Sequence, residues 1–124
     1  MHDQRTIRAT INGRNKWVRI WKEGGLDRGM DNCSLCKKFY KGEGSCENCP
    51  VAIKTGRYFC RGTPYVSWQA HHESVHNKHK TLYRVRGRCR LCLKYARGEA
   101  LFLDKLLPEE HRMFTKTGRR KRCQ

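Results

Sequence analysis

The chain has 124 residues, of which 37% are hydrophobic and 31% are charged. We expect a single domain, residues 1–124, but the low hydrophobic content makes core burial marginal, so a further staple is needed. No apolar run approaches the roughly 20 residues that span a bilayer, which argues against a membrane role. Residues 1–8 lack the apolar core of a secretory signal, so we expect a cytoplasmic protein with reduced cysteines.

The charge of the chain points to an anionic partner. The sequence has 28 Lys and Arg residues against 11 Asp and Glu residues, which gives a net charge of +17. Such a charge attracts polyanions, and small soluble domains usually carry far less. The expected partner is therefore RNA, DNA or a nucleic-acid-processing complex, and no small-molecule substrate is evident.

The first segment alternates between apolar and polar residues around Asn12-Gly13, the commonest signal for a short hairpin. This pattern predicts an N-terminal β-hairpin over residues 1–22. One face would be apolar, and the other would carry Arg8, Trp17, Arg19 and Trp21. Indole rings interleaved with guanidinium groups suit base stacking and phosphate contact. An equally good interpretation is that the tryptophans cover a second small core.

The remaining elements follow from turn residues and periodicity. Residues 33–62 are rich in glycine and cysteine and are expected to form zinc knuckles with little regular structure. Pro64 precedes a predicted helix over residues 65–80. The segment 81–107 is expected to be basic and extended at first, and then helical from Cys89, because apolar residues recur there at steps of three and four up to Pro108.

The predicted fold class is therefore α+β. We expect a small zinc-stabilised domain with an N-terminal β-hairpin, zinc knuckles and a C-terminal helix, followed by a basic tail over residues 112–124. Gly98 inside the last helix costs roughly 1 kcal/mol relative to alanine, so a packing reason or a bend is expected there.

Three Cys-x-x-Cys pairs are the strongest signal in the sequence. Two thiolates three residues apart on a tight turn both reach one tetrahedral ion, and in a chain without an export signal this predicts zinc. The candidate metal ligands are Cys33, Cys36, Cys46, Cys49, Cys60, Cys89, Cys92 and His72. Cys123, in the basic tail, is expected to be a free thiol.

The assignment of these ligands to ions has two solutions. Cys33/Cys36 and Cys46/Cys49 can close a local four-thiolate site, which leaves Cys60, Cys89, Cys92 and a histidine for a second ion. Alternatively, Cys33/Cys36 cross to Cys89/Cys92 at the start of the last helix. Four histidines are available to complete a three-cysteine site, namely His71, His72, His76 and His79.

Basic residues are concentrated in two stretches without acids. Arg84, Arg86, Arg88 and Arg90 alternate, and an extended backbone would space them at about 6.6 to 6.8 Å, close to the spacing of successive phosphates. The tail from Arg112 onward contains no acid and would order on a polyanion. The candidate nucleic-acid-binding residues are Arg8, Trp17, Arg19, Trp21, Lys78, Lys80, Arg84, Arg86, Arg88, Arg90, Arg119, Arg120, Lys121 and Arg122.

Residues 76–81 (HNKHKT) and 85–92 (VRGRCRLC) resemble the D-H-x-H…V-R-G-x-x-C-x-x-C stretch of phage endonuclease VII-type junction nucleases. The departures fall on the chemistry, since Asn77 stands at the catalytic histidine and His76 at the metal-binding aspartate. The resemblance implies a zinc scaffold without a general base or a carboxylate for a catalytic cation. If the chain were such a nuclease, His76 and His79 would be its catalytic residues.

Residues 33–36 (CSLC), 46–50 (CENCP), 54–56 (KTG) and 60–68 (CRGTPYVSW) resemble small cysteine-rich proteins of tailed bacteriophages and prophages. This resemblance implies a zinc knuckle and a phage protein in the cytoplasm of the host cell, but no reaction. The sequence predicts a non-catalytic, zinc-dependent nucleic-acid-binding accessory protein. The alternatives are a phage factor that docks on host RNA polymerase, ribosome or nuclease by protein contacts, and a His-metal nuclease.

Overall fold

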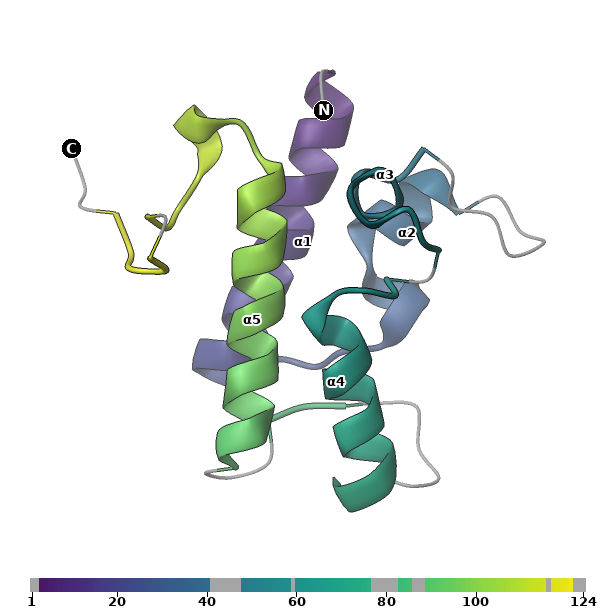
Figure 1. The fold of residues 1–124 in the computed structure, drawn as a ribbon, viewed down its shortest axis with the longest axis vertical. Coiled ribbons are helices and arrows are strands. Elements are labelled where there is room, and N and C mark those ends of the chain that lie inside the picture. Colours follow the sequence, from purple (N-terminus) through teal and green to yellow (C-terminus); the bar gives the residue numbers. More distant parts are fainter. Residues whose placement is uncertain are drawn as a thin grey trace.

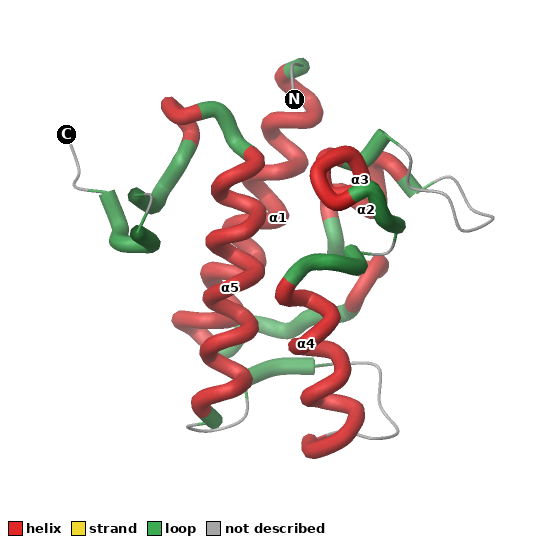
Figure 2. The backbone as a smooth tube through the Cα atoms, in the orientation of Figure 1, coloured by secondary structure: helices red, strands yellow, loops and turns green. Residues whose placement is uncertain are grey.

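The computed structural model describes residues 3–40, 48–58, 60–76, 83–85, 89–115 and 117–121. In these residues the regular elements are helices (Figures 1 and 2): α1 (Gln4–Glu23), α2 (Ser34–Phe39), α3 (Pro50–Thr55), α4 (Pro64–His71) and α5 (Arg90–Leu106). Short 3-10 turns cover Gly29–Asn32 and Glu109–His111, and a π-helical turn, His72–His76, continues α4. Extended pairing in the described part is limited to two isolated bridges, Asp27 with Tyr83 and Phe114 with Arg120. The predicted α+β fold is therefore wrong.

The predicted N-terminal hairpin is replaced by α1, which runs through Asn12-Gly13 without a turn. Asp3 caps its N-terminus, with Oδ1 accepting from the Thr6 N–H at 2.7 Å, and Gly24 ends it at a φ of 74°. The residues that α1 buries recur at helical spacing: Thr6, Ile7, Ala9, Thr10, Gly13, Arg14, Lys16, Trp17 and Ile20. Ile7 and Ile20 fit both an alternating pattern and this helical stripe. Packing of the stripe overrides the local turn signal at Asn12-Gly13.

The core lies where α1 and α4 pack against α5 (Figure 1). Trp17 of α1 meets Trp68 of α4 edge to face, with ring centroids 5.2 Å apart. On α5, Cys92, Ala96 and Ala100 are fully buried, and their small side chains let the neighbouring helices approach closely. The buried helix faces thus replace the β-hairpin that the sequence predicts.

The last helix confirms the prediction made from its periodicity. It spans Arg90–Leu106, with Cys89 and Leu107 at its two caps. It also passes through Gly98 as a continuous helix. A Cβ at this position would lie 3.2 Å from the Cβ of Pro64, which is closer than most such contacts. Gly98 therefore lets the first turn of α4 pack directly on α5, which is the packing reason that the sequence predicts.

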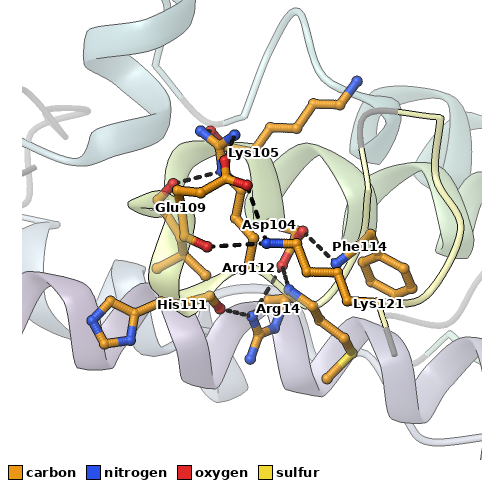
Figure 3. A network of polar contacts seen from close by, with 10 residues as sticks. Arg14, Asp104, Lys105, Glu109, His111, Arg112, Phe114 and Lys121 are labelled. Atoms are coloured by element: carbon orange, nitrogen blue, oxygen red, sulfur yellow. Dashed lines mark hydrogen bonds and ion pairs between the residues drawn. The ribbon is translucent and has the colours of Figure 1, made fainter. Parts of the chain in front are cut away.

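The segment after α5 is held back against the helices by Asp104 (Figure 3). Its Oδ1 accepts from Nη1 of Arg14 on α1 at 3.0 Å, and its carboxylate also accepts from the backbone N–H groups of Met113 and Phe114. Arg14 Nη1 further donates to the His111 carbonyl oxygen at 2.7 Å. The described part of the basic tail is therefore packed, with Phe114 buried and paired to Arg120 across a tight turn.

None of the helices in the described residues is long and apolar enough to cross a membrane.

Candidate metal centre

His71, Cys89 and Cys92 form a group that can hold a metal ion. Their ligand atoms lie within 4.8 Å of one another, and Nε2 of His71 is 3.3 Å from Sγ of Cys89. Cys92 is buried, whereas His71 and Cys89 are half-buried. An imidazole nitrogen and two thiolates are donors that zinc prefers. The residues therefore fit a zinc ion, and a tetrahedral site would take one more ligand.

Two helix ends position this group. His71 is the last residue of α4, Cys89 caps the N-terminus of α5, and Cys92 lies in the first turn of α5. Burial opposes ionisation of Cys89, but hydrogen bonds from the backbone and thiol of Cys92 outweigh it and lower the pKa of the Cys89 thiol. Thiolates are the metal-binding form of cysteine, so this environment favours ligation. An ion bound here would join the C-terminus of α4 to the N-terminus of α5.

His72, the histidine named from the sequence, lies beside this group with its nitrogens turned to carbonyl oxygens. Its Nδ1 is 2.9 Å from the Trp68 carbonyl oxygen, and its Nε2 is 2.7 Å from that of Arg84. The same Nε2 lies 3.8 Å from Sγ of Cys92, so His72 also adjoins the metal group. His72 in addition ties the end of α4 to the segment before α5.

Four other cysteines line a cavity of about 260 Å³ at α2, α3 and the start of α4. Cys33 caps α2 and Cys36 lies within it, Cys49 caps α3, and Cys60 precedes α4. A hydrogen bond from Cys36 lowers the pKa of Cys33 to about 6, against the effect of burial. The pKa of Cys36 is raised, first by its hydrogen bond with Cys33, then by burial and by the charges of Cys33, Cys60 and Cys49. The four sulfurs are therefore close enough to interact electrostatically.

None of the six cysteines in the described part of the chain is in a disulfide. The predicted ligand Cys46, as well as Cys123 and His79, lies outside the described residues, and the side chain of His76 is not described.

Sequence reasoning missed a buried carboxyl group at the same cavity. Glu99 of α5 is 2% exposed, and its Oε1 has no hydrogen-bond partner among the described residues. Burial raises the pKa of Glu99 to about 8, although hydrogen bonds from Thr63 and Tyr65 oppose the shift. The signal was present in the sequence, because Glu99 falls on the helical stripe of Cys92, Ala96 and Leu103.

The raised pKa of Glu99 makes stability depend on pH. The folded protein holds the Glu99 proton between pH 4.5 and about 8 while the unfolded chain releases it, so stability falls as pH rises through this window. At pH 7 the cost is about 3 kcal/mol. We expect Glu99→Gln to remove this dependence. Urea unfolding should then give the variant a higher free energy of unfolding than the wild type at pH 8 but not at pH 5. Parallel pH profiles for the two proteins would contradict this role.

A second buried acid, Asp27, gathers donors from three segments. Its Oδ1 accepts from Nζ of Lys16 and from the Gly29 N–H, both at 2.9 Å, and its Oδ2 accepts from Nε1 of Trp68 at 3.1 Å. Its backbone pairs with Tyr83, which fixes the segment that leads into α5. Asp27 therefore supports both the core and the loop beside the metal group.

The residues named for nucleic-acid binding are distributed over several surfaces. Trp17 is 4% exposed and packs in the core, so its ring is not available for stacking on a base. Trp21 is half-buried at the end of α1. The exposed members in the described residues are Arg8, Arg19, Arg84, Arg90, Arg119 and Arg120, and Lys121 is half-buried. Lys78, Lys80, Arg86, Arg88 and Arg122 lie outside the described residues.

Comparison with known proteins finds no matching family model, no matching curated protein and no matching solved structure. The resemblance to phage cysteine-rich proteins therefore stays a prediction, and the function has to be inferred from the residues themselves.

Proposed function

We propose that this chain is a zinc-stabilised helical domain that binds nucleic acid through one basic face. The basic face consists of Trp21 and Lys22 at the end of α1 and of Arg90, Lys94 and Arg97 on α5. The observation that carries the proposal is the position of Arg97, whose guanidinium lies 5.6 Å from the Trp21 ring centroid. Lys22 Nζ lies 4.5 Å from the same ring. Two cations gathered at one ring form a compact basic patch that suits contact with phosphates.

The three basic residues of α5 share one side of the helix. Arg90, Lys94 and Arg97 are all exposed, and their spacing of four and three residues places them on one stripe. Arg97 also donates from Nη2 to the Gly118 carbonyl oxygen at 3.0 Å, which brings the C-terminal segment with Arg119 and Arg120 alongside. The stripe, Trp21 and the tail therefore form one continuous basic area.

Burial of acidic residues leaves the surface with a larger excess of basic over acidic side chains than the whole chain has. Asp27, Glu99 and Asp104 are all buried, and two of them are paired with the buried cations Lys16 and Arg14. The exposed surface therefore loses three of the 11 acidic side chains but only two of the 28 Lys and Arg side chains to these sites. Phosphate binding is favoured by such an unbalanced field.

The metal group supports this face directly. Cys89 is the N-cap of α5 and the residue before Arg90, so an ion held by His71, Cys89 and Cys92 would fix the first turn of the basic stripe. Zinc suits this donor set, because its borderline-soft character accepts both thiolate and imidazole. The ion would thus act structurally, by orienting α5 for contact with the backbone of the nucleic acid.

Replacing the stripe should weaken binding and its dependence on salt together. For the triple variant Arg90→Gln, Lys94→Gln, Arg97→Gln we expect the log–log slope of affinity against salt for single-stranded RNA or DNA to fall by about 2, at roughly 0.7 per lost phosphate contact. Affinity at moderate salt should fall at least tenfold, by about 1.4 kcal/mol or more. Filter binding across a salt series with wild type and variant measures both quantities.

A matched control removes the same charge elsewhere. Lys37, Lys38 and Lys54 are exposed on α2 and α3, which Figure 1 places on the other side of α5 from the C-terminal segment. The corresponding triple glutamine variant should keep most of the slope. Equal losses in both variants would show a nonspecific charge effect, and a flat slope for the wild type would favour a protein partner instead.

A further inference from the structure

We propose that Cys33, Cys36, Cys49 and Cys60 form a second, all-thiolate metal centre, so that each chain holds two ions. This inference goes beyond the proposed function, because it adds a site that nucleic-acid binding does not require. It also assigns the ligands differently from either solution that the sequence leaves open. Cys60 joins the Cys33/Cys36 pair, and the His71, Cys89 and Cys92 group stands alone.

The first argument is that the four side chains surround one cavity. Cys33, Cys36, Cys49 and Cys60 all line the space of about 260 Å³ between α1, α2, α3 and α5. The Cys33 and Cys36 side chains are already hydrogen-bonded, and the backbone N–H of Cys36 donates to Sγ of Cys33 at 3.2 Å. Thiol groups that reach one cavity from three segments are the type of donor found in structural zinc sites.

The second argument is the backbone of Cys60. It has a φ of 60° and is the one non-glycine residue of the described part with positive φ. Side chains rarely adopt this conformation, and it persists where the surroundings impose it. The Thr63 hydroxyl donates to the Cys60 carbonyl oxygen at 2.6 Å, which fixes the turn just before α4. The result is a cysteine directed into the cavity at a conformational cost that ligation of an ion would offset.

The third argument separates Cys60 from the other metal group. Cys60 lies just before α4 begins, whereas His71 is the last residue of that helix. Eight helical residues advance about 12 Å, while two sulfur ligands of one zinc ion lie at most about 4.6 Å apart. In Figure 1, α2 and α3 lie near the start of α4, whereas the N-terminus of α5 lies near the end of α4. Two ions are therefore needed to use all seven described ligands.

Neighbouring charges fit a cation surrounded by thiolates. Four thiolates and one Zn²⁺ carry a net charge of −2, and the basic side chain of Lys16 lines the same cavity. Phe39, Val51 and Ala52 line other parts of the cavity and give it an apolar wall. A soft divalent cation, zinc before the others, is the chemical class that such a site takes.

The test is the zinc content of the full-length protein, purified reduced, with native mass spectrometry as the readout. We expect two zinc ions in the wild type, one in Cys60→Ser and one in Cys92→Ser. Cys46→Ser is the matched control and should keep two ions. Cys46 is the Cys-x-x-Cys partner of Cys49 in the sequence, but it is not in the proposed set. Cys60→His supplies an alternative ligand and should also keep two, which covers the case in which Cys60→Ser does not fold.

Two results would overturn the proposal. One is a wild type that binds a single ion, and the other is a Cys46→Ser protein that loses an ion while Cys60→Ser retains two. Failure of the proposed function is a separate outcome, because nucleic-acid binding is measured on the basic face and does not enter the ion count.

Discussion

Replacing Asp27 with alanine is expected to lower the free energy of unfolding by about 3 to 5 kcal/mol. The carboxylate is fully buried and pairs with Nζ of Lys16 at 2.9 Å, so its removal leaves an ammonium group without its counter-charge. The Trp68 indole N–H and the Gly29 N–H lose their acceptor in the same step. Urea unfolding followed by tryptophan fluorescence measures the change, because Trp17 and Trp68 lie in the core beside Asp27.

A double variant shows whether the buried charge is the cause. Lys16→Met removes the stranded ammonium group, so Asp27→Ala with Lys16→Met should recover part of the loss, whereas independent effects would add. Glu23→Ala is the control, since Glu23 is exposed at the end of α1 and should change stability by less than about 0.5 kcal/mol. A double variant that is less stable than Asp27→Ala alone would show that the pair is held by packing rather than by charge.

The sequence alone predicts α5, because the periodicity of this helix and the signals for both of its ends lie within or next to the segment. Apolar residues recur on one side of the helix, Cys89 caps its start, and Pro108 follows its end. The start of α4 at Pro64 was predicted on similar grounds, and the structure describes the helix to His71 and a π-helical turn to His76. Such signals need no information from distant parts of the chain.

The N-terminal helix was missed because its deciding contacts are distant. Arg14 and Lys16 carry no local signal of burial in the sequence, yet both are buried on the inner side of α1. Their partners are Asp104, 90 residues away, and Asp27, 11 residues away, neither of which is visible in a local pattern. Gly13, taken as a turn residue, faces Ser34 and Leu103 across a close helix contact. Tertiary packing therefore reversed a local signal that favoured a hairpin.

The sequence predicts which residue types form the candidate site, but it does not predict which of these residues lie together. The spacing of the cysteine pairs names thiolate ligands, and four histidines were available as partners. The direction of each side chain depends on where α4 ends, because His71 and His72 are consecutive but point to different neighbours. The cavity of Cys33, Cys36, Cys49 and Cys60 likewise depends on how α2 and α3 pack beside α5.

Loss of the ion at His71, Cys89 and Cys92 is expected to separate α4 from the first turn of α5. These residues join the two helix ends, and the neighbouring His72 contacts the Arg84 carbonyl oxygen before α5. A metal present at 1,000 times its dissociation constant stabilises the folded state by about 4 kcal/mol. We expect His71→Ala, measured in zinc, to lower Tm by roughly 15 °C, following the usual relation between stability and melting temperature.

The control for this variant is His111→Ala, which removes an imidazole from outside the metal group and keeps the carbonyl that Arg14 contacts. It should melt close to the wild type, and both it and the wild type should lose Tm on addition of a zinc chelator. His71→Ala should respond less to the chelator, because one of its ions is already weakened. If the chelator removes zinc from the wild type without lowering Tm, the ion does not stabilise the fold.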